Sequence, residues 1–216
     1  YTKMGDSKKY LIIGASSGIG SALLTLLKTD QHQVITASRR LVTDSSVHIS
    51  LDVTKDELDV RHLPDSLDGL VYCPGSINLK PFHRITDHEF MEEFHLNVTG
   101  AIKVVRSVLP LLKNSQQASV VCFSTVAVQQ GMPFHSSVAV AKGAIEGLTR
   151  SLAAEFAPKI RVNCIAPSLI NTPLAARLLS SEEKKKTMDE RHPSKRVGEA
   201  EDIARLASFL LSPQSS

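Results

Sequence analysis

The chain has 216 residues, 42% of them hydrophobic, which is enough for one α/β domain with a full core and too little for two comfortable domains. Its net charge of +3 is a mild excess, and no basic stripe with interleaved aromatic residues occurs, so neither nucleic acid nor a membrane surface is an expected partner. No apolar run reaches the ~18 residues of a membrane span, and the N-terminus lacks an apolar signal core. We therefore expect a cytoplasmic protein, with Met4 as a candidate natural start.

The three cysteines, Cys73, Cys122 and Cys164, lie far apart in apolar, strand-like contexts. No CxxC and no His-x-x-x-His spacing occurs, so we predict neither disulfides nor a metal site. Free, buried thiols fit a reducing cytosol.

Short apolar runs alternate with helical patterns along the chain. The predicted strands are residues 10–14, 33–38, 47–53, 69–73, 118–124 and 160–166. The predicted helices are 19–28, one long helix from a Thr86–Glu89 capping box past Val108, one from 138 to 156, a charged solvated helix within 181–192, and 201–212. This alternation predicts a single domain, 1–216, with a doubly wound, Rossmann-type parallel sheet in three α/β/α layers. Its ligand crevice lies at the carboxyl ends of the strands.

The connection between the second and third strands, residues 39–46, is unusually short. A parallel crossover normally needs about a dozen residues or more. We expect a turn in place of the usual helix there, and a thinly covered face of the sheet.

The segment GASSGIG (14–20) stands directly between the first strand and the first helix. Gly14 allows the sharp turn, Gly18 lets the backbone approach a phosphate, and Gly20 allows close helix–sheet packing. The helix N-terminus offers free N–H groups and partial positive charge to a pyrophosphate. A plain glycine-rich turn is the alternative, but the flanking strand and helix favour a dinucleotide site. The predicted contacts are Gly14, Ser16, Ser17, Gly18, Ile19 and Gly20.

The spacing GxxxGxG resembles that of the short-chain dehydrogenase/reductase family. Similar segments cover nearly the whole chain: LDV (51–53), NVTG (97–100), the active-site helix to substrate loop (141–173), and the ending RVGEAEDIARLASFLLS (196–212). The chain is identified as a member of this family. The resemblance implies hydride transfer between a nicotinamide cofactor and a carbonyl or alcohol. It also implies cofactor contacts at Asp52, Val53, Pro74, Gly75, Lys142, Pro167 and Thr172.

The end of the second strand bears on the cofactor's ribose. Members that select NAD usually carry an acidic residue there, whereas this chain has Ser38 followed by Arg39 and Arg40. An arginine can bind a 2′-phosphate with two hydrogen bonds, although two solvated surface arginines are the alternative. We predict NADP(H) in preference to NAD(H).

The catalytic half of the family pattern is altered. Lys142 matches the family's lysine, Asn97 its water-holding asparagine, and Thr125, with Ser124 beside it, its serine. The position of the proton-carrying tyrosine falls on Val138, which carries no proton. The loops YCPG (72–75) and PS (167–168) also depart from the family, so the chain resembles an atypical member without the active-site tyrosine.

Three replacements for the tyrosine remain open. His135 lies one helical turn before Val138, and imidazole is the commonest general acid, but an exposed loop histidine is the alternative. Tyr72 ends the fourth strand and either faces the crevice or fills space. Lys142 acts alone or through a water held by Asn97.

Two functions therefore compete. One is an NADP(H)-dependent oxidoreductase with a non-standard proton donor; the other is a catalytically silent NADP(H)-binding protein, a sensor or scaffold. Residues 168–195 are expected to form a substrate lid, and their apolar LINTPLAARLLSS segment predicts a substrate with an apolar portion. The family normally adds a seventh strand after LLSPQSS (210–216), where this sequence stops. An arbitrary boundary, a disordered tail and a true truncation are the alternatives, and a true truncation would leave the sixth strand as an exposed edge. We expect a homodimer or homotetramer.

Overall fold

The computed structural model describes residues 7–216, so the candidate start Met4 lies outside the described residues. Six parallel strands form one sheet in the order β3-β2-β1-β4-β5-β6. Their bounds are β1 Lys9–Ile13, β2 Gln33–Ser38, β3 Val47–Ser50, β4 Gly69–Tyr72, β5 Ala118–Phe123 and β6 Ile160–Ile165. From β1 the chain adds β2 and β3 on one side and then β4, β5 and β6 on the other, so the strand order reverses between β1 and β4. Doubly wound folds bind their ligands at this switch point.

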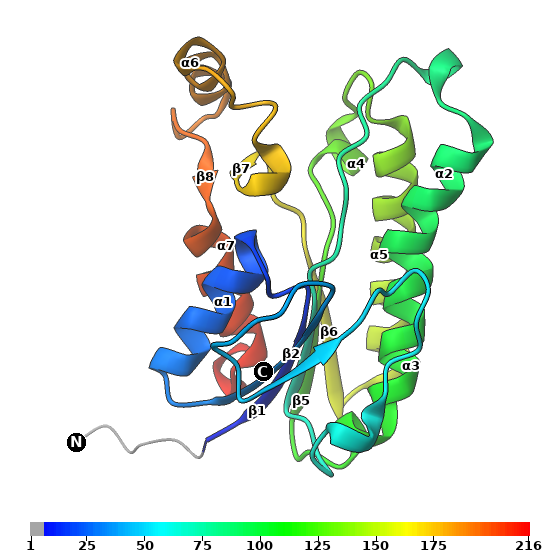
Figure 1. Ribbon diagram of the computed structural model, residues 1–216, viewed down its shortest axis with the longest axis vertical. Coiled ribbons are helices and arrows are strands. Elements are labelled where there is room, and N and C mark those ends of the chain that lie inside the picture. Colours follow the sequence, from blue (N-terminus) through cyan, green and yellow to red (C-terminus); the bar gives the residue numbers. More distant parts are fainter. Residues whose placement is uncertain (1–6) are drawn as a thin grey trace.

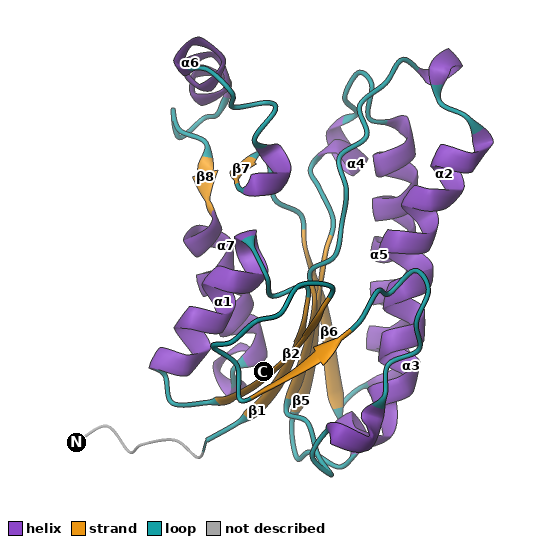
Figure 2. Cartoon of the chain, viewed as in Figure 1, coloured by secondary structure: helices purple, strands orange, loops and turns teal. Residues whose placement is uncertain are grey.

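Helices cover both faces of this sheet, as Figures 1 and 2 show. One layer holds α1 (Gly18–Thr29) and α7 (Ala200–Leu211), and the other holds α2 (Asp87–Phe94), α3 (Gly100–Lys113) and α5 (Ser136–Phe156). Beyond the strand ends lie the short α4 (Ala127–Gln130), α6 (Glu182–Arg191), and a small second sheet of β7 (Ile170–Asn171) and β8 (Gly198–Glu199). The predicted three-layer α/β fold is confirmed.

Alternation along the strands divides the core between the two helix layers. In β1, Leu11 and Ile13 pack on the α3–α5 side, whereas Tyr10 and Ile12 pack on the α1–α7 side. All four are buried, as are all residues of β4 and β5. Strands buried on both faces read as unbroken apolar runs, which is why the sequence shows them so clearly.

The predicted long helix is not continuous. The Thr86–Glu89 capping box is present, and α2 ends at Phe94. Residues His95–Thr99 then form a π-helical turn before α3 begins at Gly100. The extra residue in a π turn rotates the face of the helix that follows it relative to the face of the helix before it, while the apolar residues still recur along the sequence. Such turns often occur at functional sites.

Smaller differences concern element ends. The third strand stops at Ser50, three residues before the predicted end, because only residues 47–50 pair with β2. The predicted turn replaces a helix in the β2–β3 connection, and the residues of β3 are exposed or half-buried. Within the described residues, β6 is a sheet edge, as expected.

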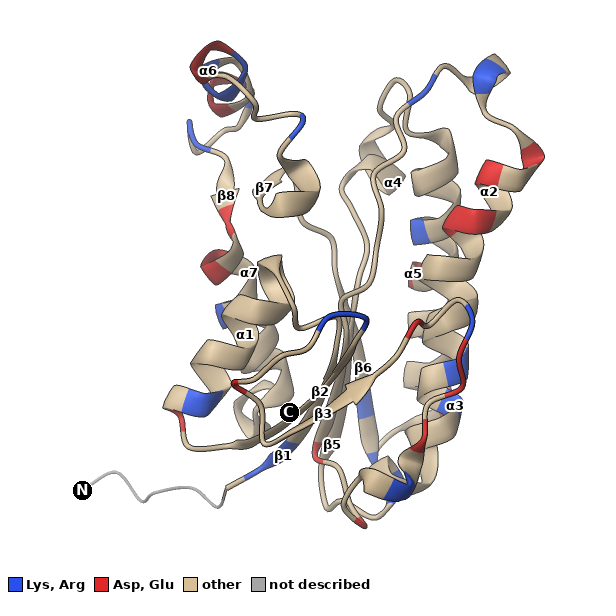
Figure 3. Ribbon diagram, in the orientation of Figure 1, with Lys and Arg blue, Asp and Glu red and all other residues tan. Residues whose placement is uncertain are grey.

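The mixed-charge segment forms a solvated helix. Residues of α6 are nearly all exposed or half-buried, and Figure 3 shows acidic and basic residues side by side on it. Among residues 7–216, none of the helices has the length and apolarity that crossing a bilayer requires.

Candidate functional site

A cleft of about 380 Å³ opens at the carboxyl ends of β1, β2 and β4. This volume is within the range of small-molecule and cofactor sites. Its lining includes the predicted residues Gly14, Ser16, Ser17, Gly18, Ile19, Gly20, Ser38, Arg39, Asp52, Val53, Pro74, Gly75 and Thr172. The structure thus brings predicted residues from five separate segments of the chain to one place.

The glycine-rich turn has the geometry of a phosphate cradle. Gly14 and Gly18 adopt positive φ angles of 82° and 55°, a region that disfavours side chains. A Cβ on Gly20 would lie 2.4 Å from the carbonyl oxygen of Gly14, so only glycine lets α1 start this close to β1. The site therefore fits a dinucleotide by its backbone shape.

The N-terminus of α1 is open toward this cleft. Its N-cap residue Ser17 makes no side-chain capping bond, and the first intrahelical bond from the turn is donated by the N–H of Ser21. No acidic residue lies in the first turn. The free N–H groups of residues 18–20 and the helix dipole are thus available to an anionic group.

The adenine side of the cleft carries the basic pair. Arg39 and Arg40 both line it, and the hydroxyl of Ser38 donates to the carbonyl oxygen of Arg40 at 2.8 Å, which holds this turn. Hydrogen bonds from Thr54 lower the pKa of Asp52, so this carboxylate is charged and already engaged. Within residues 7–216, the guanidinium groups of Arg39 and Arg40 have no hydrogen-bond or ion-pair partner, so both are available to a phosphate in the cleft.

Two predicted cofactor contacts, Lys142 and Pro167, do not line the cleft. The carbonyl oxygen of Pro167 accepts a hydrogen bond from the N–H of Val126 at 3.1 Å, so Pro167 joins the loops after β5 and β6. Thr172 does lie at the cleft, with its side chain 3.3 Å from the position of a Cβ on Gly18.

The predicted lysine and asparagine meet behind Gly75. A Cβ on Gly75 would lie 3.4 Å from both Nζ of Lys142 and Oδ1 of Asn97. Lys142 comes from α5 and Asn97 from the π-helical turn, so sheet and helices together assemble this pair. Burial lowers the pKa of Lys142, partly opposed by nearby acidic groups. Asn97 is fully buried, and its Oδ1 has no partner among the described residues.

Glu93 is a member of this cluster that the sequence pattern did not reveal. Only 4% of it is exposed, and its Oε2 accepts hydrogen bonds from Ser76 at 2.6 Å and from Nδ2 of Asn97 at 3.2 Å. The available signal was a carboxylate beside the apolar stripe of α2, one helical turn before Asn97. Helix position alone does not distinguish it from the exposed Glu92.

The side-chain hydroxyls of Ser124 and Thr125, the two candidates for the family's serine, make different contacts. Ser124 is buried and donates to Glu146 on α5 at 2.6 Å, so its hydroxyl is used inside the fold. Thr125 is half-buried, and its hydroxyl oxygen accepts only a 3.3 Å bond from the N–H of Ala127. Among residues 7–216, the O–H of Thr125 therefore has no acceptor and is available to a ligand.

The tyrosine position and its suggested replacements are also resolved. Val138 is 6% exposed on α5, one turn before Lys142. His135 is the N-cap residue of α5, and its Nδ1 lies 2.7 Å from the carbonyl oxygen of Pro133, which assigns the proton to Nδ1. Tyr72 is buried and donates to the carbonyl oxygen of Leu96 at 2.6 Å, so its suggested position facing the crevice is wrong. It packs β4 against the π-helical turn.

The three cysteines are free, as predicted. Burial raises the pKa of Cys73 and of Cys122 to about 12 and that of Cys164 to about 11, so all three are neutral thiols at physiological pH. Within the described residues, His, Cys, Asp and Glu side chains form no group suited to a metal ion.

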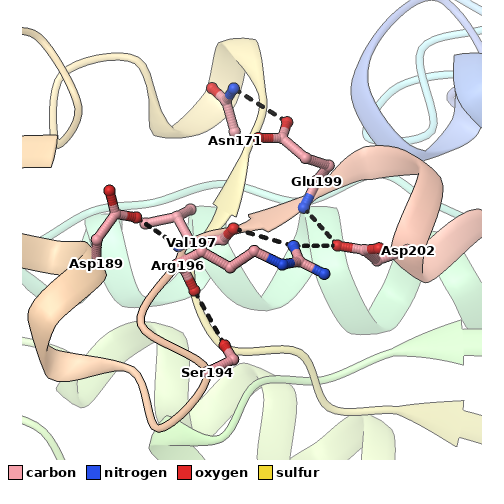
Figure 4. A network of polar contacts seen from close by, with 7 residues as sticks. All are labelled: Asn171, Asp189, Ser194, Arg196, Val197, Glu199 and Asp202. Carbon is pink, nitrogen blue, oxygen red and sulfur yellow. Dashed lines mark hydrogen bonds and ion pairs between the residues drawn. The ribbon is translucent and has the colours of Figure 1, made fainter. Parts of the chain in front are cut away.

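A polar network ties the predicted lid to the body of the domain (Figure 4). Arg196 bonds to Asp202 at 2.6 Å, Asp202 also accepts from the N–H of Glu199, and Glu199 accepts from Asn171 at 3.1 Å. Asp189 on α6 accepts from the N–H of Val197 at 2.6 Å. The lid is thereby joined to the N-terminus of α7.

A family model described as enoyl-(acyl carrier protein) reductase matches residues 14–216. A tropinone reductase homolog from Arabidopsis thaliana is 36% identical over an alignment of 226 residues, gaps included, and the alignment covers 95% of this chain and 86% of the relative. The protein named dehydrogenase/reductase SDR family member 4 from Homo sapiens is 30% identical over 97% of this chain and 83% of the relative. Among solved structures, an ElxO variant with NADPH bound has a TM-score of 0.86 at 25% identity, over 96% of this chain and 92% of that chain.

Proposed function

The chain belongs to the short-chain dehydrogenase/reductase family, and from that premise we propose that it is an NADP(H)-dependent oxidoreductase whose proton donor is not a tyrosine. It reduces a carbonyl or oxidises an alcohol. The observation that carries this proposal is the cleft at the switch point, where the open N-terminus of α1 and Arg39 face the same space. The similarity to a tropinone reductase homolog and to an NADPH-bound structure supports it.

The residues present fit the cofactor in two parts. The cradle at 14–20 binds the pyrophosphate, and Arg39 binds the 2′-phosphate with charge-assisted hydrogen bonds. Asp52 and Val53 border the adenine, whereas Pro74, Gly75 and Thr172 border the nicotinamide half. The bound cofactor supplies or accepts the hydride.

The proton must then come from the protein. Val138 carries none, and Tyr72 is engaged with a backbone carbonyl. Lys142 lies directly behind Gly75 of the cleft lining, in the space that it shares with Oδ1 of Asn97, an atom without a partner among residues 7–216. We propose that the Lys142 ammonium donates the proton, directly or through a water held by Asn97, and that the hydroxyl of Thr125 polarises the substrate oxygen.

His135 is the alternative donor. It lies at the start of α5, with Nε2 free to take and give a proton. Neither His135 nor Lys142 lines the cleft itself, but Nζ of Lys142 lies directly behind Gly75 of its lining, so Lys142 is favoured.

A second candidate function follows from Val138 alone. Losing a general acid typically costs ~10²–10⁴ in rate. A chain that binds NADP(H) without turnover, as a sensor or scaffold, is therefore the competing proposal.

The proposal also covers the substrate, the cellular location and the oligomeric state. We propose that residues 168–195 close over a substrate with an apolar portion, because Leu174 lines the cleft and is 52% exposed. We also propose a cytoplasmic homodimer or homotetramer.

The test is NADPH oxidation with the protein in excess over a panel of aldehydes and ketones. The native chain, His135→Ala, Lys142→Ala and Val138→Tyr are compared after NADPH binding is confirmed for each. Turnover by the native chain that His135→Ala keeps and Lys142→Ala loses supports the proposal. A native chain that binds NADPH without turnover, together with activity gained by Val138→Tyr, supports the silent alternative.

A further inference from the structure

The proposed reaction leaves a buried carboxylate without a role. Glu93 lies on α2 with 4% exposure, although a charged side chain in such a position is costly unless it is well paired. Its Oε2 atom accepts both the hydroxyl of Ser76 and the amide of Asn97. The chain therefore builds a specific site for this charge beside the catalytic residues.

These bonds set the orientation of Asn97. Its Nδ2 atom donates to the carbonyl oxygen of Glu93 at 2.9 Å as well as to the carboxylate. With both amide hydrogens directed at Glu93, Oδ1 is the end that reaches the space beside Gly75. That space also receives Nζ of Lys142, each atom 3.4 Å from the same point.

Several titratable groups surround Lys142. Three thiols and one carboxylate are close enough to act electrostatically on Lys142: Cys164 on β6, Cys122 on β5, Glu93 on α2 and Cys73, which follows β4. The thiols are neutral at physiological pH because burial raises their pKa. Glu93 is thus the anionic group among those that act on Lys142. Desolvation lowers the pKa of Lys142, and the charge of Glu93 opposes this.

We propose that Glu93 is a positioning residue for proton transfer: its carboxylate turns Oδ1 of Asn97 toward Lys142 and holds Lys142 in its protonated form. This inference rests on the proposed function, in which Lys142 replaces the missing tyrosine as the acid. Bound NADPH would supply the hydride for the carbonyl carbon, and the ammonium of Lys142 gives its proton to the carbonyl oxygen. The neutral amine left behind recovers its proton from water, and Glu93 favours that return by its charge.

The first test needs no turnover. The protein is labelled with lysine carrying ¹³C at the ε-carbon, and the Lys142 signal, assigned by its loss in Lys142→Arg, is titrated with pH. We expect a lower midpoint in Glu93→Gln, which keeps the shape and removes the charge. Glu92→Gln is the matched control, because Glu92 is the neighbouring residue on α2, exposed and paired with His88. Its midpoint stays at the native value.

Glu93→Asp keeps the charge at a shorter reach, so its midpoint is expected between those of the native chain and Glu93→Gln. The inference is overturned if folded Glu93→Gln, verified by circular dichroism, titrates like the native chain. It is equally overturned if Glu93→Asp and Glu93→Gln lower the midpoint alike, since the effect is then steric.

The second test is the pH profile of NADPH-dependent reduction. A lower midpoint for Lys142 moves the alkaline loss of kcat to lower pH in Glu93→Gln. On the alkaline side of the profile, kcat of this variant should fall at least about tenfold below that of the native chain. This is less than the ~10²–10⁴-fold loss expected when the acid itself is removed. An unshifted profile contradicts the inference. If the native chain shows no turnover, the proposed function fails, and the titration alone still decides whether Glu93 controls Lys142.

Discussion

At the scale of single residues, we expect Val138 to affect proton transfer and not cofactor binding. The shape of the phosphate cradle depends on the backbone of Gly14, Gly18 and Gly20, and the structure has the backbone geometry that a cradle requires. In the proposed function, the position of the family's proton-carrying tyrosine is held by Val138, whose side chain is buried. Because we propose that backbone N–H groups and Arg39 hold the cofactor, we expect its binding to survive the changes in the catalytic half.

Arg39 is expected to decide between the two nicotinamide cofactors. Arg39→Ala should weaken NADPH binding by roughly 10- to 100-fold, since a hydrogen bond to a charged group contributes ~1.5–3 kcal/mol. NADH has no 2′-phosphate, so its affinity for the same variant is the internal control and should hardly change. Titration calorimetry with both cofactors measures this. An equal loss for both would show that Arg39 supports the fold of the turn and not the phosphate.

At the scale of elements, the distance between β1 and α1 depends on one glycine. A Cβ on Gly20 would contact the backbone of Gly14, which has no way to rotate aside. Gly20→Ala is therefore expected to lower the free energy of unfolding by about 1–3 kcal/mol, as overpacked sites do. NADPH binding should weaken too, because the start of α1 moves.

Gly147→Ala is the matched control on α5, where an added Cβ has no atom within 4 Å. It should stabilise the chain by up to about 1 kcal/mol, the difference in helix propensity between alanine and glycine. Urea unfolding measures both variants. A Gly20→Ala variant as stable as the native chain would refute the packing argument.

The lid network makes a separate prediction at this scale. Hydrogen bonds from Arg196 and from the N–H of Glu199 lower the pKa of Asp202 to about 2. A carboxylate with a depressed pKa stabilises the fold above its ordinary value near 3.8, and this contribution is lost as pH falls through about 2. The network is therefore complete at neutral pH.

Asp202→Asn removes the ion pair with Arg196 at all pH values. We expect faster tryptic cleavage within 181–196 for this variant at neutral pH, because α6 opens more often from the body of the domain. Glu201→Gln, the adjacent acidic residue in the first turn of α7, is the control and should cleave at the native rate. High salt should reduce the difference, since the pair is exposed. Identical cleavage rates for all three proteins would count against a role in holding the lid.

At the scale of the whole molecule, exposed apolar side chains support the proposed oligomer. Val140 on α5 is 57% exposed, and Phe134 just before this helix is 56% exposed. Light scattering should give a mass that is a multiple of 23.5 kDa. Val140→Glu is expected to lower that mass by placing a charge in the contact. Leu41→Glu should not, although Leu41 in the β2–β3 turn is itself 74% exposed. A native mass of a single chain would end the oligomer proposal.

The sequence by itself determined the sheet, most of its helices and the residues that line the cleft at the glycine-rich turn. These features depend on local patterns: strands buried on both faces are continuous apolar runs, and GASSGIG needs only its own strand and helix to form a cradle. The short 39–46 connection was equally readable, because it follows from chain length alone.

The tertiary structure decided the catalytic half. The π-helical turn that aims Asn97, the burial of Glu93, and the inward bonds of Ser124 and Tyr72 all depend on contacts between residues distant in the chain. Glu92 and Glu93 look alike in a helical pattern, yet one is solvated and the other lies against Asn97 and Ser76. Periodicity reports which face of an element is apolar, but only packing decides which polar side chain on the border of that face is drawn into the core.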